Sequence, residues 1–167
     1  MLKRIGIILL PFLFTSCEVS GQVLSKGYDR MLGALLSHTV NEVSVEQLSK
    51  DVEKTILLDA RAVREFEVSH LKDAIWVGYD DFNIASVKDI PKSSNIVVYC
   101  SVGYRSEKVA EKLKKAGYLH VSNLYGGIFE WKNQGNEVVN QQKTTDKVHA
   151  YNKLWGKWLN KGEKVYN

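Results

Sequence analysis

Residues 95–106, NIVVY followed by CSVGYRS, decide the fold that we expect for this chain. Residues 95–99 form a short apolar run rich in β-branched side chains, which is typical of a strand buried on both faces of a sheet. Residues 106–116 carry an apolar stripe at helical spacing, and Gly117 can end that helix. A buried strand that leads through a loop into a helix predicts a parallel α/β unit.

The same periodicities extend in both directions along the chain. A short apolar run predicts a buried strand at residues 55–59, and residues 41–44, 74–77 and 120–124 are expected to form further strands. Helical spacing predicts helices over residues 28–38, 45 onward, 63–67, 82–90 and 128–134, with Ser44 and Gln47 forming a capping box before the second of these. Strands that alternate with helices predict one α/β domain with a mainly parallel central sheet and helices on both faces.

Composition places the chain among ordinary globular proteins. It has 167 residues, 44% of them hydrophobic and 25% charged, with a net charge of +4. This charge is too small to indicate a nucleic-acid partner. Residues 137–167 form a basic extension that contains two tryptophans, and a polar connector over residues 136–146 precedes its last helix.

The first 16 residues have the pattern of an export signal. Lys3 and Arg4 precede an apolar run over residues 5–14 that is too short to cross a bilayer. The run ends in Phe14-Thr15-Ser16-Cys17, which resembles a bacterial lipobox. The resemblance implies cleavage before Cys17, lipidation of Cys17, and attachment to a bacterial membrane, with the outer membrane facing the periplasm as the expected site. The alternative is a plain signal peptide in which Cys17 is unmodified.

Cys100 is then the only thiol of the mature chain, which excludes an internal structural disulfide. It follows a buried strand directly, and sites in parallel α/β sheets lie at the carboxyl ends of strands. Gly103 allows the loop to curl, so that backbone N–H groups form an anion nest around the sulfur. Ser106 can cap the following helix, and Arg105 adds a cation. These features favour a thiolate at Cys100 or a bound oxyanion.

Three motifs in one order resemble the single-domain rhodanese (thiosulfate sulfurtransferase) family over residues 41–136. The loop CSVGYRS is similar to that family's active loop, and residues 57–77 (LLDARAVREFEVSHLKDAIWV) are similar to its upstream signature. Residues 124–135 (LYGGIFEWKNQG) are similar to its closing segment. The resemblance implies a rhodanese-like α/β domain, preceded by a tether and short helix at residues 17–40 and followed by a helical extension.

The resemblance also implies a mechanism without a metal or an organic cofactor. Cys100 takes sulfur from a small donor such as thiosulfate, becomes a persulfide, and passes the sulfur to a thiol or cyanide. The loop that binds substrate and persulfide then comprises Ser101, Val102, Gly103, Tyr104, Arg105 and Ser106, in which Arg105 would orient the donor's sulfonate. The C-x4-R spacing is one residue shorter than the C-x5-R loop of phosphatases and favours sulfur transfer over phosphate hydrolysis.

Several roles stay open at this point. Ser101 stands where many family members have Arg, which could weaken thiosulfate binding. Asp59 could brace the active loop or cap the next helix, whereas Arg61, Glu65 and His70 match family positions of a structural hydrogen-bonded set. A non-catalytic module that binds a partner or senses sulfur is the alternative to an enzyme.

The end of the chain allows three interpretations. Residues 147–160 are expected to form one helix with an apolar, aromatic face, made of Tyr151, Leu154, Trp155, Trp158 and Leu159. Packing of that face on the domain is the simplest interpretation. Contact with a membrane surface or docking of a protein partner are the others.

Overall fold

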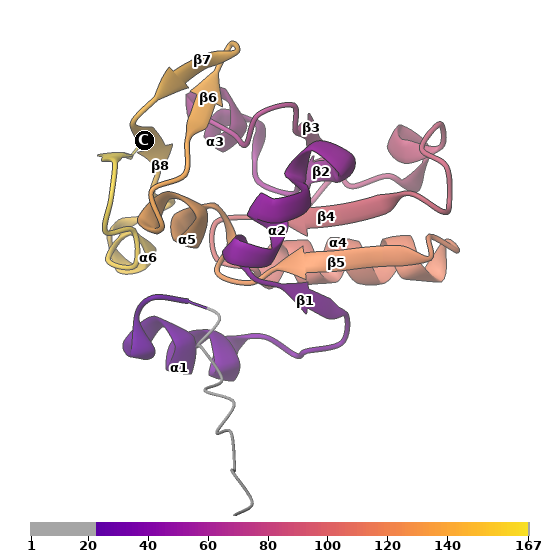
Figure 1. The fold of residues 1–167 in the computed structure, drawn as a ribbon, viewed down its shortest axis with the longest axis horizontal. Coiled ribbons are helices and arrows are strands. Elements are labelled where there is room, and N and C mark those ends of the chain that lie inside the picture. Colours follow the sequence, from indigo (N-terminus) through magenta and orange to yellow (C-terminus); the bar gives the residue numbers. More distant parts are fainter. Residues whose placement is uncertain (1–22, 167) are drawn as a thin grey trace, which may run out of the picture.

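The computed structural model describes residues 23–166, so the expected signal segment and Cys17 lie outside the described residues. A five-stranded sheet forms the centre of the domain, and its strand order is β1-β5-β4-β2-β3 (Figure 1). All neighbours are parallel. The strands are β1 (Asn41–Val43), β2 (Ile56–Asp59), β3 (Ile75–Trp76), β4 (Asn95–Tyr99) and β5 (His120–Leu124). The predicted parallel sheet is therefore confirmed, and β4 and β5 have the predicted bounds.

Helices connect these strands in the expected order. They are α1 (Lys26–Leu35), α2 (Val45–Asp51), α3 (Val63–Val68), α4 (Tyr104–Lys115) and α5 (Gly127–Asn133), with 3-10 turns η1 (Val52–Lys54) and η2 (Ile84–Val87). The capping box of Ser44 and Gln47 is confirmed at the start of α2. The helix expected over residues 82–90 is wrong: only the single turn η2 forms there, because Val87 alone is buried and no apolar face supports a longer helix.

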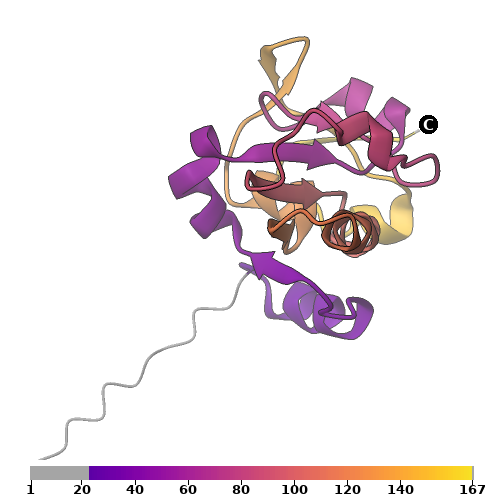
Figure 2. The same ribbon diagram turned by 90° about the vertical axis from the view of Figure 1, so that its right-hand side faces the viewer.

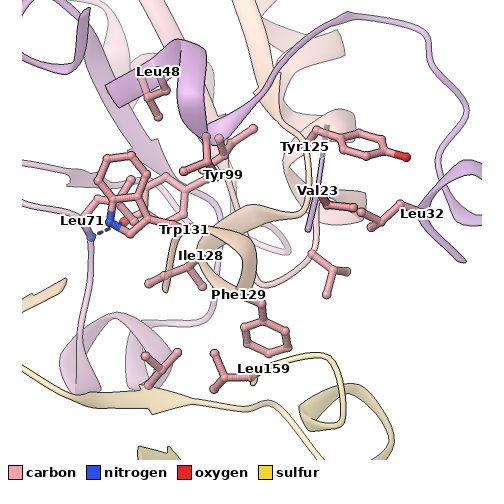
Figure 3. Packing of buried hydrophobic residues seen from close by; sticks show 14 of the residues in the cluster. Val23, Leu32, Leu48, Leu71, Tyr99, Tyr125, Ile128, Phe129, Trp131 and Leu159 are labelled. Carbon is pink, nitrogen blue, oxygen red and sulfur yellow. Dashed lines mark hydrogen bonds between the residues drawn. The ribbon is translucent and has the colours of Figure 1, made fainter. Parts of the chain in front are cut away.

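Alternate residues of the central strands point into two separate cores. Leu57, Val97 and Tyr99 face one core, which contains residues of α1, α2 and α5. Figure 3 shows Tyr99 in this core beside Trp131 and Ile128, with its hydroxyl accepting a hydrogen bond from the Leu71 backbone. Leu58, Ile96 and Val98 face the other core, which also contains residues of α4. Figure 2 shows the ribbon turned by 90°, with α4 viewed along its axis beside the strands. Burial on both faces explains why β4 is apolar at every position but its first.

The segment before β1 packs on the domain through apolar and polar contacts. Leu32 and Leu36 are buried in the first core, and the Tyr28 hydroxyl donates a hydrogen bond to the Gly126 carbonyl over 2.8 Å. The buried carboxylate of Glu107 accepts hydrogen bonds from the backbone N–H groups of Ser37 (3.0 Å) and Thr39 (3.2 Å). This end of the described chain is thus tied to α4 and to the turn before α5.

The C-terminal extension differs from the helix predicted over residues 147–160. The strands β6 (Val138–Asn140) and β7 (Lys143–Thr145) form an antiparallel hairpin where a polar connector was expected, and β8 (Lys147–His149) pairs in parallel with β9 (Glu163–Val165). Only α6 (Lys153–Gly156) is helical. Tyr151 has a left-handed backbone with φ +63°, and Asn152 caps a new helix after it, so the two residues interrupt the expected helix.

The predicted packing of this extension holds for part of its apolar set. Leu159 is buried, and Trp158 stacks on Tyr28 with ring centroids 5.3 Å apart. Leu154 is exposed instead, because α6 is too short to turn every apolar residue inward. None of the helices within residues 23–166 has the length and apolar character that crossing a bilayer requires.

Candidate active site

Cys100 lies at the carboxyl end of β4, in the loop that joins this central strand to α4. The helix α4 begins at Tyr104, two residues earlier than predicted, and Gly103 occupies its N-cap with φ +119°. The Gly103 backbone N–H donates a hydrogen bond to Cys100 Sγ over 3.1 Å. Cys100 is 1% exposed, so the sulfur sits inside a tight loop, with the amide end of a helix beside it.

Ser106 does not cap α4, contrary to the prediction. It lies within the first turn, where its hydroxyl is 3.0 Å from the Gly103 carbonyl oxygen and 2.7 Å from Asn123 Oδ1. The side-chain amide of Asn123, on β5, also donates to the Gly103 carbonyl, over 3.1 Å. These contacts fix the orientation of the Gly103 carbonyl group, and the N–H of the same residue binds Cys100 Sγ. Ser106 therefore positions the loop through Gly103.

The N-terminus of α5 supports the loop from its other side. The backbone N–H of Ile128 donates to the Cys100 carbonyl over 2.9 Å, and that of Phe129 donates to the Ser101 carbonyl over 3.2 Å. A Cβ atom on Gly127, which has φ +56°, would lie 2.3 Å from the Cys100 carbonyl oxygen. From the sequence alone, Gly126 and Gly127 predict no more than a tight turn. The signal for this contact is a glycine placed directly at the start of a helix that abuts another backbone.

Glu65 is the carboxylate that braces the loop, a role that the sequence analysis did not assign to it. Arg105 donates to it from Nη1 (2.7 Å) and Nη2 (2.8 Å), and the Ser101 hydroxyl donates over 3.0 Å. Burial raises the pKa of the Glu65 carboxyl, but the hydrogen bonds and charge of Arg105, with the charge of Arg61, outweigh it and lower the pKa to about 2. Arg105 is therefore held by α3 through a paired charge.

Asp59 and Arg61 form a separate buried pair. The carboxylate of Asp59 accepts hydrogen bonds from the backbone N–H, Nε and Nη2 of Arg61, and Nη2 also donates to the Ser69 carbonyl over 2.6 Å. Bracing of the loop thus comes from Glu65, and Asp59 positions Arg61. His70 stacks on Phe66, with centroids 3.9 Å apart, and its Nδ1 is 3.0 Å from the Phe66 carbonyl oxygen. The expected single set of Arg61, Glu65 and His70 is therefore divided among three places.

Within residues 23–166, no three His, Cys, Asp or Glu side chains come together in a way that could hold a metal ion. The chemistry available to this site is that of one thiol, backbone N–H groups and a buried Arg-Glu pair.

The family model of the rhodanese-like domain matches residues 44–134, more than half of the chain. The chain belongs to the rhodanese-like domain family. A sulfurtransferase of Allochromatium vinosum is 35% identical to it over 103 residues, which are 60% of this chain and 95% of that protein.

The chain is also similar to a longer protein and to a protein of known structure. A tRNA uridine(34) hydroxylase of Photorhabdus laumondii is 32% identical over 108 residues, 60% of this chain but only 31% of the hydroxylase. The crystal structure of a Bacillus halodurans protein superposes with a TM-score of 0.56 at 25% identity, over 68% of this chain and 84% of that one. The rhodanese-like fold thus recurs alone and as part of longer chains.

A cavity of about 400 Å³ opens beside Cys100. The rhodanese-like segment contributes the loop residues and several neighbours: Ala62, Arg64, Glu65, Tyr79, Asp80, Ser101, Val102, Tyr104 and Arg105. Leu35, Tyr151 and Trp155 also line the cavity, and all three lie outside the residues matched by the family model. The extension, for which packing on the domain was the simplest expectation, therefore also reaches the site.

Proposed function

We propose that this protein is a sulfurtransferase that carries sulfane sulfur on Cys100 as a persulfide. The single observation that carries the proposal is the placement of Cys100 Sγ at the start of the C-x4-R segment, at hydrogen-bond distance from the Gly103 N–H. A donor N–H and the start of α4 stabilise negative charge on this sulfur, in its thiolate form and in a persulfide. The sulfurtransferase of Allochromatium vinosum, matched over nearly its whole length, supports the same activity.

The first half-reaction conserves charge and needs no oxidant. The Cys100 thiolate attacks the outer sulfur of thiosulfate, the S–S bond of the donor breaks, and sulfite leaves with the bonding electron pair. Cys100 then carries a persulfide anion, which the loop's N–H groups stabilise. In the second half-reaction an acceptor thiolate or cyanide attacks the terminal sulfur, and the Cys100 thiolate is regenerated.

Arg105 acts mainly on the loop in this arrangement. Its two terminal nitrogens donate to Glu65, and Nη2 also donates to the Ser101 hydroxyl over 3.0 Å. A guanidinium paired in this way contributes less attraction to a donor's sulfonate than a free one would. We therefore assign Arg105 to positioning the loop, with sulfonate binding as a secondary role.

Intact-mass spectrometry of the purified chain tests the proposal. After incubation with excess thiosulfate or a thiosulfonate and desalting, the protein should gain one sulfur atom, and a reducing thiol should remove it. Cys100→Ser keeps a hydrogen-bond acceptor at the same place and should gain nothing. Absence of the gain with every sulfane donor would support a non-catalytic module instead, and hydrolysis of an aryl phosphate would support a phosphatase.

A further inference from the structure

Two aromatic side chains from the C-terminal extension stand over the cavity that holds Cys100. Tyr151 and Trp155 line it together with Leu35 of α1, and we call these three residues the apolar wall. Trp155 and Leu35 are partly buried against the first core, whereas Tyr151 is 45% exposed. The wall therefore brings both flanking segments of the chain to the cavity that Cys100 lines.

The position of Tyr151 is held at a cost in backbone strain. Its φ of +63° is one that residues with a large side chain rarely adopt. Two hydrogen bonds hold the backbone there: the Tyr151 N–H donates to the side-chain Nδ1 of His149 over 3.1 Å, and the Ala150 N–H donates to the Val165 carbonyl over 2.9 Å. The result places the ring 5.2 Å from the Arg105 guanidinium, at the entrance to the loop.

The charges around the cavity do not favour a doubly charged inorganic donor. Arg105 is paired with Glu65 on two hydrogen bonds. Arg64 and Asp80, which also line the cavity, are exposed side chains of opposite charge. A cavity of about 400 Å³ lies within the range of about 300–1,000 Å³ in which proteins hold organic ligands. It is therefore larger and more apolar than thiosulfate requires.

We propose that the apolar wall binds the organic group of the sulfur donor, so that the protein prefers sulfane donors with an apolar substituent over inorganic thiosulfate. The inference rests on the proposed function and names its substrate class. With a thiosulfonate, the Cys100 thiolate attacks the outer sulfur, the bond between sulfane and sulfonyl sulfur breaks, and the organic sulfinate leaves with the electron pair. The thiolate and the thiosulfonate each carry one negative charge, and so do the persulfide and the sulfinate, so charge is conserved.

A donor series of thiosulfate, methanethiosulfonate and benzenethiosulfonate tests the wall, with cyanide as the common acceptor. The measured quantity is kcat/KM for each donor, divided by the rate of the same donor with a small free thiol to remove intrinsic reactivity. The chain should prefer benzenethiosulfonate over methanethiosulfonate by about tenfold or more, since burying an aromatic ring discriminates on that scale.

Variants then assign the preference to the wall. Tyr151→Gly suits the left-handed backbone and should lower the preference ratio, benzenethiosulfonate over methanethiosulfonate, severalfold. The double substitution of Tyr151→Gly with Trp155→Ala should bring this ratio close to one. Leu154→Ala is the matched control, because Leu154 lies beside Trp155 in α6, is 65% exposed and does not line the cavity. It should leave the ratio unchanged.

The outcomes distinguish the donor-binding role of the wall from the sulfurtransferase activity of Cys100. A ratio near one in the unmodified chain, or a ratio that survives the double substitution, would overturn the role of the wall while sulfur loading itself persists. If none of the three donors places sulfur on Cys100, the proposed function fails, and the inference fails with it.

Discussion

The loop around Cys100 and the apolar wall opposite it are built by different means. The loop is buried and cross-linked by hydrogen bonds to β5, to the start of α5 and to Glu65 on α3. Tyr151 of the wall is 45% exposed, and the wall comes from segments outside the rhodanese-like match. The sheet and the elements packed on it therefore hold Cys100 in a fixed place, whereas segments added to the domain can change what approaches it.

Gly127→Ala should have the largest effect on stability. A Cβ would lie 2.3 Å from the Cys100 carbonyl oxygen and 2.7 Å from the Ser101 carbonyl carbon, both backbone atoms that cannot move aside freely. We expect a loss of about 3 kcal/mol or more in the free energy of unfolding, measured with urea, together with loss of sulfur loading.

Gly117→Ala is the control that separates the two penalties of Gly127→Ala, the clash of the new Cβ and the strain of a left-handed backbone. Gly117 has φ +89°, and a Cβ there would meet nothing within 4 Å, so only the left-handed conformation is penalised. Its cost should be about 1–2 kcal/mol. Equal losses for the two variants would contradict the close packing of α5 on the loop.

Glu65→Gln should follow, with a loss of about 3 kcal/mol at neutral pH, because it leaves the Arg105 charge without its buried partner. The pKa of Glu65 is lowered from 4.5 to about 2, so the stability it contributes is fully present above pH 4.5 and is lost as pH falls toward 2. The gap in urea midpoint between the unmodified chain and the variant should therefore narrow over that interval.

Glu67→Gln serves as the matched control for this pH dependence. Glu67 lies on the same helix α3 and is exposed, so its substitution should change the free energy of unfolding by no more than about 0.5 kcal/mol. A difference in urea midpoint between the unmodified chain and Glu65→Gln that stays constant down to low pH would contradict the ion pair of Glu65 with Arg105.

Among the substitutions at the cavity and its loop, Tyr151→Gly should change stability least. The substitution removes a half-exposed ring but also relieves the φ of +63°, and we expect the two effects to leave the free energy of unfolding within about 1 kcal/mol. Urea unfolding checks this. A loss as large as that of Gly127→Ala would show that the wall is part of the structural core, and the contrast with the loop would no longer hold.

The sequence predicts the central sheet well because its signals are local. β4 is an apolar run bounded by loops, and the capping box before α2 needs only Ser44 and Gln47. Residues 147–160 mislead for the opposite reason. Their apolar spacing fits a helix, yet pairing of β8 with β9, 16 residues further on, and the left-handed Tyr151 prevent one. Such pairings depend on tertiary contacts that periodicity does not contain.

The site divides in the same way. Cys100, Gly103 and Arg105 are visible in the sequence because they lie in one loop next to a strong strand. Glu65 lies 40 residues from Arg105, and Tyr151 lies beyond the family's segment, so only the folded chain brings them together. Local patterns identify Cys100 as the candidate nucleophile, and long-range packing identifies the residues that hold it and those that share its cavity.

Transfer of labelled sulfur tests the central claim most directly. The purified chain would be loaded from thiosulfate labelled in its outer sulfur, desalted, digested and mapped, and a second portion would be mixed with an acceptor thiol. The account predicts that the label resides on the peptide containing Cys100 and moves to the acceptor in a single turnover, at one sulfur per chain. Label that never enters this peptide, or enters it and does not leave, would contradict a sulfur-transferring role for Cys100.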